Sequence, residues 1–268
     1  MLSLTAPRVN ALSAYMHRQV ELDEKVFRRS NTTLAKALQG GRYLTRKNLQ
    51  SKLLRAKIPA EGQRLGYLLM RAELEGILCS GPRTGKQFTY ALLEERVPSC
   101  KPIDRNEALA VLSARYFRSR GPATVQDFSW WSGLNMHDAR AGIESLPAEF
   151  EHEFSVGKHY VFPIRLPSGK SSPRPTFLMP EYDEYWISYQ DRSALFKPIY
   201  KPTDRKKDGP SRQYSLVIDG VISGTSRKDV KRRTAIIETD FKNSLTALQQ
   251  QMVNRAARRY DAFLNPTM

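Results

Sequence analysis

The feature that most constrains the fold of this chain is a basic loop that follows three helical segments. The segments span residues 24–39, 45–56 and 60–78, and the loop is SGPRTGKQFTY at residues 80–90. The first segment ends at a Gly-Gly pair suited to a helix C-terminus, and the second begins at a threonine that can cap it. The loop runs on into alternating apolar side chains, as in a hairpin. Three helices followed by a hairpin with a basic, glycine-containing tip are typical of a winged helix.

The loop also has to be tested as a phosphate-binding loop for nucleotides. That motif needs four residues between its first glycine and a Gly-Lys pair, then Ser or Thr, and it opens a helix. Here three residues separate Gly81 from Gly85, Gln87 stands at the hydroxyl position, and the helical segment comes before the loop. The sequence therefore excludes a nucleotide loop and favours the wing of a winged helix.

The third helical segment, residues 60–78, has two different faces. One arc of its helical wheel is apolar and is expected to be buried: Leu65, Leu68, Leu69 and Ala72. The opposite arc is polar and basic, and we expect it to be free to enter a major groove while the wing follows the phosphates. The residues predicted to contact DNA are Gln63, Arg64, Tyr67, Arg71, Arg83, Thr84 and Lys86. The alternative is a winged helix used for protein contacts.

The same order of segments repeats between residues 104 and 165. A helical segment ends at Gly121-Pro122, and two more precede a possible second hairpin. The free face of the third of these helices is nearly neutral and includes a carboxylate that would repel phosphate: His137, Arg140, Ala141 and Glu144. We therefore expect this block to be mainly architectural. We also expect Trp130 and Trp131 to pack within the protein rather than to stack on bases.

A third block follows a polar, proline-containing linker at residues 168–175. Strand-like runs surround Asp219-Gly220, a strong signal for a two-residue hairpin, and a helix is expected from about residue 244 to 264. Between residues 196 and 233 there are 11 Lys and Arg against 4 Asp. The residues of this block predicted to contact DNA are Arg227, Lys228, Lys231 and Arg232.

The charge of the chain indicates the kind of partner. It contains 43 Lys and Arg against 27 Asp and Glu, a net charge of +16. Such an excess points to a polyanion, of which nucleic acid is the commonest, and the alternative is a generally solvated basic surface. We expect double-stranded DNA as the partner, and a monomer.

No metal, cofactor or membrane is expected. The two cysteines, Cys79 and Cys100, are too few for a zinc site or a disulfide framework, and the four histidines lack ligand spacing. The first residues have neither the basic leader of an export signal nor an apolar run long enough to span a bilayer. These features favour a cytoplasmic protein.

Three stretches resemble the AlkZ-like winged-helix DNA-binding proteins, bacterial DNA glycosylases among them. They are EGQRLGYLLMRAELEGILCSGPRTGKQFTYALLEERVP, RYFRSRGPATVQDFSWWSGL and LMPEYDEYWISYQDRSAL, and they follow one another over nearly the whole chain. The resemblance implies tandem winged helices and a small β-barrel-like domain around duplex DNA. It also implies excision of alkylated bases or unhooking of crosslinked ones, without a metal.

The expected fold class is therefore α+β, with tandem winged-helix domains followed by a small C-terminal β-barrel-like domain and a terminal helix. We expect a winged-helix domain with an N-terminal extension at residues 1–100 and a second winged-helix domain at residues 101–167. Residues 168–268 are expected to form the β domain with its terminal helix.

The family carries its catalytic pair as Gln-aliphatic-Gln or Gln-aliphatic-Asp in an N-terminal winged-helix module, and we expect this chain to begin after that module. Gln19-Val20-Glu21 has a similar look in a different context, and the three glutamines at residues 249–251 lack the aliphatic centre. The resemblance therefore transfers no catalytic residue to this chain.

Two carboxylates remain as candidate catalytic residues. Asp183 and Glu184 lie near Asp191, and paired carboxylates can act as base and stabiliser in glycosidic cleavage. The alternative is that these acids pair with Arg174 or Arg192, or accept from backbone amides.

The sequence therefore predicts a duplex-DNA-binding protein related to alkylation-repair glycosylases and catalytically silent by itself. Two other readings stay open. One is an active glycosylase that uses residues not recognised above. The other is a winged-helix transcription regulator or interaction scaffold, for which only residues 244–264 suggest a dimerisation helix.

Overall fold

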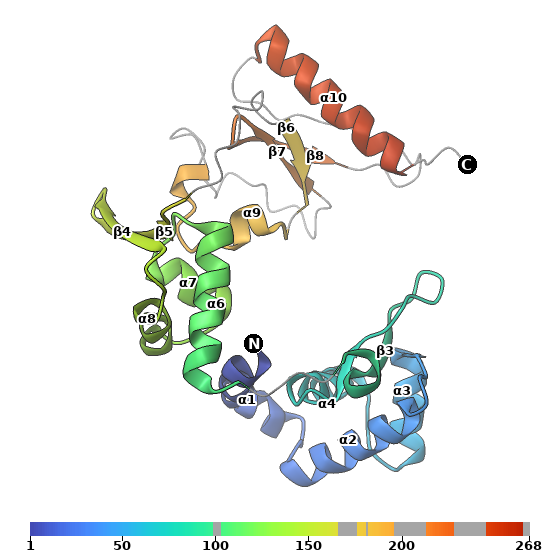
Figure 1. Ribbon diagram of the computed structural model, residues 1–268. Coiled ribbons are helices and arrows are strands. Elements are labelled where there is room, and N and C mark those ends of the chain that lie inside the picture. Colours follow the sequence, from blue (N-terminus) through green and yellow to red (C-terminus); the bar gives the residue numbers. More distant parts are fainter. Residues whose placement is uncertain (99–102, 166–175, 181, 196–212, 228–244, 265–268) are drawn as a thin grey trace. The chain divides into compact units, whose positions relative to one another are not determined.

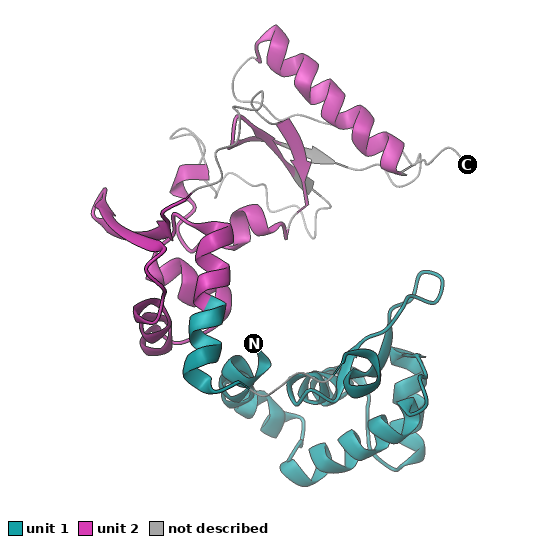
Figure 2. Ribbon diagram, in the orientation of Figure 1, with its two compact units in different colours: residues 1–112 teal, residues 113–268 magenta. Residues whose placement is uncertain are grey.

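The computed structural model describes residues 1–98, 103–165, 176–180, 182–195, 213–227 and 245–264 (Figure 1). The chain divides into two compact units, residues 1–112 and 113–268 (Figure 2). The division falls inside helix α6 (Arg105–Arg120). The domain boundaries expected at residues 100 and 167 fall in stretches outside the described residues, so they stay predictions.

Unit 1 contains the predicted order of three helices and a hairpin, preceded by a further helix. Its elements before α6 are α1 (Leu2–Gln19), α2 (Glu24–Leu38), β1 (Leu44–Thr45), α3 (Arg46–Arg55), α4 (Gly62–Leu74), β2 (Leu78–Ser80), β3 (Thr89–Leu92) and α5 (Leu93–Arg96). The strands form an antiparallel sheet in the order β1-β3-β2. The pairing of β1 with β3 therefore places the start of α3 beside the β2–β3 hairpin.

Side chains at the helix starts explain where α2 and α3 begin. The Asp23 carboxylate accepts a hydrogen bond from the Val26 amide at 2.7 Å. Thr45 and Asn48 form a capping box, in which each side chain accepts from the other residue's backbone amide. A cap of this kind stabilises a helix by about 1 kcal/mol. The predicted cap at Thr45 is confirmed.

The apolar arc predicted for α4 forms the centre of the unit 1 core. Its four members are at most 4% exposed: Leu65, Leu68, Leu69 and Ala72. They pack with buried leucines of α2 and α3. Burying one such leucine side chain stabilises the fold by about 2 kcal/mol. The inward face of α4 was therefore predicted correctly.

Helix α1 was missed because it carries almost no apolar stripe. Of its 18 residues only Leu4, Ala6 and His17 are buried, and Pro7 lies inside it. A helix with so few buried positions leaves little periodic signal in the sequence. It nevertheless contacts α4, and this contact changes which face of α4 is free.

The second block, which lies mostly in unit 2, also has the predicted elements. They are α6, α7 (Val125–Ser132), α8 (Met136–Glu144) and the antiparallel pair β4 (Phe150–Ser155) and β5 (Lys158–Pro163). Thr124 and Asn135 cap α7 and α8 as their side chains imply. On α8, Ala139 is buried, while His137, Arg140 and Glu144 are exposed. The predicted free face of α8 is confirmed for these three residues.

The C-terminal part of unit 2 is a small antiparallel sheet with helices on it. Its elements are β6 (Thr176–Met179), α9 (Glu184–Ile187), the 3-10 turn η1 (Ser193–Leu195), β7 (Gln213–Ile218), β8 (Val221–Arg227) and α10 (Ala247–Leu264), with strand order β6-β7-β8. Asp219 and Gly220, both with positive φ, form the turn between β7 and β8. The predicted hairpin and terminal helix are confirmed.

The barrel-like arrangement expected for this part is wrong, because the described strands form an open sheet of three. One face of the sheet, with Leu216 and Ile218, packs against Val253 of α10. The other, with Val217 and Ile222, packs against side chains that include Tyr185 of α9. Since helices bury both faces, the sheet has no need to curl on itself. None of the described helices is long and apolar enough to cross a membrane.

Candidate nucleic-acid interface

The polar face of α4 is not free as predicted, and Arg64 shows why. Its side chain is only 17% exposed. Its guanidinium donates to the carbonyls of Pro59 at 3.1 Å and Glu21 at 3.2 Å, and also to the carbonyl of Val20. These bonds fasten the start of α4 to the turn that follows α1.

Arg71 and Tyr67 are held in the same way further along α4. The Arg71 guanidinium donates to Glu24 Oε2 at 3.0 Å and to Glu75, and it lies 4.9 Å from the centre of the Phe27 ring. The Tyr67 ring packs edge-on against His17 of α1. The prediction of a free face is therefore wrong for Arg64, Tyr67 and Arg71, because α1 and the start of α2 cover it. Gln63 remains exposed.

His17, at the centre of this covered face, is 5% exposed and packs between the rings of Phe27 and Tyr67. Burial, and next the charge of Arg71, lower the pKa of its imidazole. Its Nε2 atom is buried without a hydrogen-bond partner. The neutral ring is therefore the form that fits between the two aromatic side chains.

The tip of the β2–β3 hairpin is exposed as predicted. Thr84 and Gln87 exchange both backbone hydrogen bonds at 3.1 Å, and Gly85 has φ +58° in the two-residue turn between them. Arg83, Thr84 and Lys86 are all exposed, and Arg83 stacks on the Phe88 ring at 4.5 Å. The tip therefore presents two cations on a fixed turn.

Sequence reasoning missed a second basic group, at the start of α3. Arg46 and Lys47 are exposed, and no acidic residue occurs between residues 39 and 60 or between residues 80 and 92. The pairing of Thr45 with Thr89 places these side chains beside the hairpin. Arg46 also lies over α4, 3.6 Å from where a Cβ atom on Gly66 would stand. We call Arg46, Lys47, Arg83 and Lys86 the basic surface; the acid-free run of residues 39–60 was the signal for its first half.

The corresponding hairpin of unit 2 has a different surface. Glu151 and Glu153 are exposed on β4, and Phe154 and Val156 near the tip are 63% and 92% exposed. A hairpin with carboxylates exposed on one strand and apolar side chains near its tip repels phosphate rather than binding it. This agrees with the architectural role expected for the second block.

The basic residues predicted near the end of β8 are only partly described. Arg227 is the last residue of β8, paired with Gln213. Lys228, Lys231 and Arg232 lie outside the described residues. Their contacts with DNA stay predictions.

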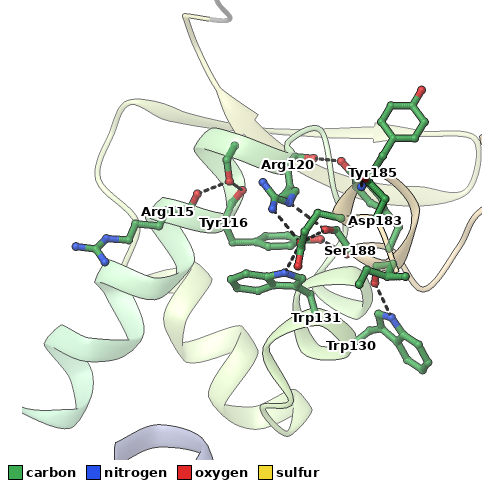
Figure 3. A network of polar contacts seen from close by, with 12 residues as sticks. Arg115, Tyr116, Arg120, Trp130, Trp131, Asp183, Tyr185 and Ser188 are labelled. Atoms are coloured by element: carbon green, nitrogen blue, oxygen red, sulfur yellow. Dashed lines mark hydrogen bonds and ion pairs between the residues drawn. The ribbon is translucent and has the colours of Figure 1, made fainter. Parts of the chain in front are cut away.

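Glu184, one of the two candidate catalytic acids, joins a polar network in which Figure 3 labels its partners Arg120, Trp131 and Ser188. Its Oε2 atom accepts from Ser188 Oγ at 2.6 Å, from Arg120 Nη2 at 2.9 Å and from Trp131 Nε1 at 2.9 Å. The Ser188 hydroxyl and then the Arg120 guanidinium hold the pKa of this carboxyl below its ordinary value. An ionised carboxylate that joins α6, α7 and α9 is suited to holding these helices together, and its lowered pKa makes it a weak general base.

The neighbouring acids are engaged as well. Asp183 caps α9 by accepting from the Tyr185 amide at 2.9 Å. Asp191 is paired with Lys158, and the hydrogen bonds from Lys158 and Ser193 lower the pKa of the Asp191 carboxyl to about 2. The expectation that these acids pair with basic side chains or accept from backbone amides is thus correct, although the basic partners are different ones.

The partners of these acids differ from those expected. Arg120 rather than Arg192 pairs with Glu184, whereas Arg192 lies over the rings of Trp130 and Trp186. Arg174 lies outside the described residues. Arg120 could not be selected beforehand because it is 64 residues away from Glu184 in the sequence.

The segments that resemble the family motif lie at the ends of helices. The carbonyls of Val20 and Glu21 accept from Arg64, and Glu21 has φ +53°, so Gln19 ends α1 and residues 20–21 form the turn that follows it. Gln249 and Thr246 exchange hydrogen bonds at the start of α10, as in a capping box. Within the described ranges, no group of three or more His, Cys, Asp or Glu side chains could hold a metal ion.

Comparison with known proteins adds to this geometry. Residues 1–263 match the family model described as DNA glycosylase AlkZ-like. The structure is similar to that of Streptomyces sahachiroi DNA glycosylase AlkZ, with a TM-score of 0.74 and 18% sequence identity over 97% of this chain and 73% of that one. No curated protein matches the sequence.

Proposed function

The chain belongs to the AlkZ-like family of DNA glycosylases, and on that premise we propose that it binds alkylated or crosslinked duplex DNA through unit 1. The match over residues 1–263 is the observation that carries this proposal, since it covers both units. The net charge of +16 supports it, because a strongly basic protein gains affinity by releasing the counterions of phosphate.

We interpret residues 24–92 and 105–163 as two winged helices. In both, helices precede an antiparallel hairpin, and a short segment before the second helix pairs with the last strand: β1 with β3, and Ala123 with Val161 of β5. In this interpretation α4 is the helix nearest the groove and the β2–β3 hairpin is the wing.

The proposed contacts with DNA are made by the basic surface, with Thr84 at the tip and Gln63 at the exposed start of α4. All of these side chains are exposed. Arg64 and Arg71 are instead assigned to holding α4 against α1 and α2, because their guanidinium groups already have carbonyl or carboxylate partners. Phosphate contacts from the basic surface would fix the position of the protein on DNA without selecting a sequence.

We further propose that residues 1–268 bind damaged DNA without releasing the base. Cleavage of the N-glycosidic bond needs groups that stabilise an oxocarbenium-like sugar and position water. Among the described residues, Asp183 caps a helix and Glu184 accepts three hydrogen bonds through one oxygen, so both carboxylates are engaged in holding the fold rather than in acting as base or stabiliser. We place this activity with the chromosome in the cytoplasm of a bacterial cell, with the protein acting as a monomer.

The binding proposal is tested by the salt dependence of duplex affinity. Anisotropy of a labelled duplex should show affinity falling steeply with salt, with a log–log slope of several units, as phosphate counterions are released. An affinity that is the same at low and physiological salt would contradict the electrostatic interface and favour a scaffold.

The catalytic proposal is tested with a duplex that contains one 7-methylguanine. After incubation with the protein, abasic sites should form no faster than in buffer, although the same duplex is bound. Release of the damaged base that disappears in Glu184→Gln but persists in the matched Glu151→Gln variant would contradict the proposal and place the chemistry in the Glu184 network.

A further inference from the structure

The three tryptophans of this chain meet at one pocket of unit 2. Trp130 and Trp131 come from α7 and Trp186 from α9, and the sequence contains no other tryptophan. Together with Tyr182, Glu184 and Arg192 they line a pocket of about 490 Å³, which we call the tryptophan pocket. A volume of this size is in the range of small-molecule sites.

The rings of Trp130 and Trp131 are held in place by the protein itself. The indole N–H of Trp130 donates to the Ile187 carbonyl at 3.0 Å, and that of Trp131 donates to Glu184 at 2.9 Å (Figure 3). The Trp130 side chain nevertheless remains 54% exposed, so it is not packed within the protein as the sequence led us to expect, and Tyr182 is 79% exposed. Large aromatic surface that is oriented but left open in a pocket is typical of a binding site.

Arg192 indicates the chemistry of the ligand. Its guanidinium lies 4.9 Å from the centre of the Trp186 ring and 5.7 Å from that of Trp130, and its Nε donates to the Tyr189 carbonyl at 3.1 Å. A cation already placed over two indole rings repels a second cation, such as a methylated lysine. It attracts a ligand that combines a flat π-system with negative charge. A nucleotide has both properties.

We propose that the tryptophan pocket holds one unpaired nucleotide of DNA, with its base stacked on Trp130 and its phosphate at Arg192. The proposal rests on the proposed function, since it takes DNA as the ligand. Proteins that act on a base in duplex DNA first remove it from the stack, and the cost is lowest at a damaged or mismatched pair. A stacking site on the protein lowers that cost further, because stacking on an aromatic side chain replaces part of the stacking that is lost.

The experiment measures tryptophan fluorescence, which reports on this pocket because all three tryptophans of the chain line it. A short oligodeoxythymidine should quench the fluorescence in a saturable way. A fully paired duplex of the same length should bind without that quenching, because its bases are already stacked. A duplex with one unpaired base should both bind and quench the fluorescence.

Variants of Trp130 separate stacking from general packing. Trp130→Leu should weaken binding of the oligodeoxythymidine about tenfold, as expected for loss of one base–aromatic stack. Trp130→Phe keeps a π-face and should retain most of the affinity. Phe263→Leu, which alters an exposed aromatic residue of α10 instead, is the matched control and should bind as the unaltered protein does. Circular dichroism of each variant checks that the fold is intact.

The outcomes distinguish this proposal from the proposed function. Absence of quenching, or equal oligodeoxythymidine affinity in Trp130→Leu and the unaltered protein, would overturn the nucleotide pocket, while duplex binding that depends on salt would still support the proposed function. Quenching that is lost in Trp130→Leu supports the pocket even if the paired duplex fails to bind.

Discussion

Residues 24–92 and 105–163 share an order of elements but differ in the charge that they expose. The first block presents Arg83 and Lys86 on its hairpin tip and has no acid between residues 80 and 92. The second exposes Glu151 and Glu153 on β4 and the apolar Val156 near its tip. The elements depend on caps and buried apolar side chains, which the two blocks have in common. The exposed positions are not needed for capping or for the core, so their charge can differ. One arrangement of helices and strands can therefore present a basic surface in the first block and an acidic and apolar one in the second.

The two units, residues 1–112 and 113–268, each join helices through an arginine–glutamate pair. In the first, Arg71 of α4 joins Glu24 at the start of α2. In the second, Arg120 of α6 joins Glu184 of α9. In both, a pair distant in sequence fixes a helix that local pattern alone leaves unplaced. Cationic side chains near a proposed DNA surface can therefore have a structural role.

The largest effect is expected from reversing the charge of the first hairpin tip. The double substitution Arg83→Glu and Lys86→Glu should weaken duplex DNA binding by about 2–3 kcal/mol at low salt, because two phosphate contacts become repulsive. Anisotropy titrations measure the loss, and the salt slope should fall as well. The matched change in the second block, Arg140→Glu, should alter affinity less than about twofold. Equal losses of DNA affinity from the substitutions in the two blocks would show that the first block is not the main DNA-binding surface.

The next largest effect concerns Arg71, and it is expected in stability rather than in binding. Arg71→Ala removes bonds to two carboxylates and the contact with Phe27, so the free energy of unfolding should fall by about 2 kcal/mol. Denaturant titration measures this change, and anisotropy under conditions where the variant is folded should show nearly unchanged DNA affinity. Loss of most of the DNA affinity in a folded variant would show instead that Arg71 contacts DNA.

A smaller effect is expected for Glu184→Gln in unit 2. The substitution keeps the shape but removes the charge that Arg120 and Ser188 stabilise, and it should cost about 1 kcal/mol because the side chain is half exposed. Hydrogen exchange in peptides covering α9 should accelerate, whereas exchange in α4 should not change. Unchanged exchange in α9 would mean that this network contributes nothing to stability.

The smallest effect is a difference in pH dependence between the two units. The pKa of His17 is lowered in the fold, so the unfolded chain takes up a proton first and unit 1 should lose stability as pH falls through 6.5. The pKa values of Glu184 and Asp191 are also lowered, so unit 2 should lose stability at more acidic pH, below the ordinary carboxyl range.

Hydrogen exchange of peptides from each unit between pH 7 and pH 5 measures the first loss. His17→Phe should remove it without changing unit 2. Identical pH profiles for α1 in the unaltered protein and in this variant would contradict the assignment to His17.

Much of this fold was readable from local signals in the sequence. The caps at Thr45, Thr124 and Asn135, the apolar arc of α4 and the turn at Asp219-Gly220 are all found where they were predicted. Each of these features depends on side chains within a few residues of one another. The exposed basic tip belongs to the same group, since its turn is closed by Thr84 and Gln87 alone.

The errors have one physical cause. Helix α1 carries almost no apolar stripe, so its presence was not predicted. Nothing in the sequence therefore indicated that Val20 and His17 would cover Arg64 and Tyr67. The free face of α4 was therefore misjudged, although its buried face was correct. The expectation of a barrel failed in the same way, because the packing of α10 and α9 on the sheet is a contact between distant segments.

The sequence by itself determined where elements start and end, which arcs are buried, and that the chain is basic and resembles DNA-binding proteins. Only the tertiary structure decided which of these cations are exposed. Arg64 donates to carbonyls of the turn after α1, and Arg71 donates to carboxylates of α2 and of the end of α4. Arg46 and Lys47, in contrast, are exposed beside the hairpin. The physical reason is that a charge is neutralised by whatever group the fold brings within a few ångströms, and local sequence does not specify that group.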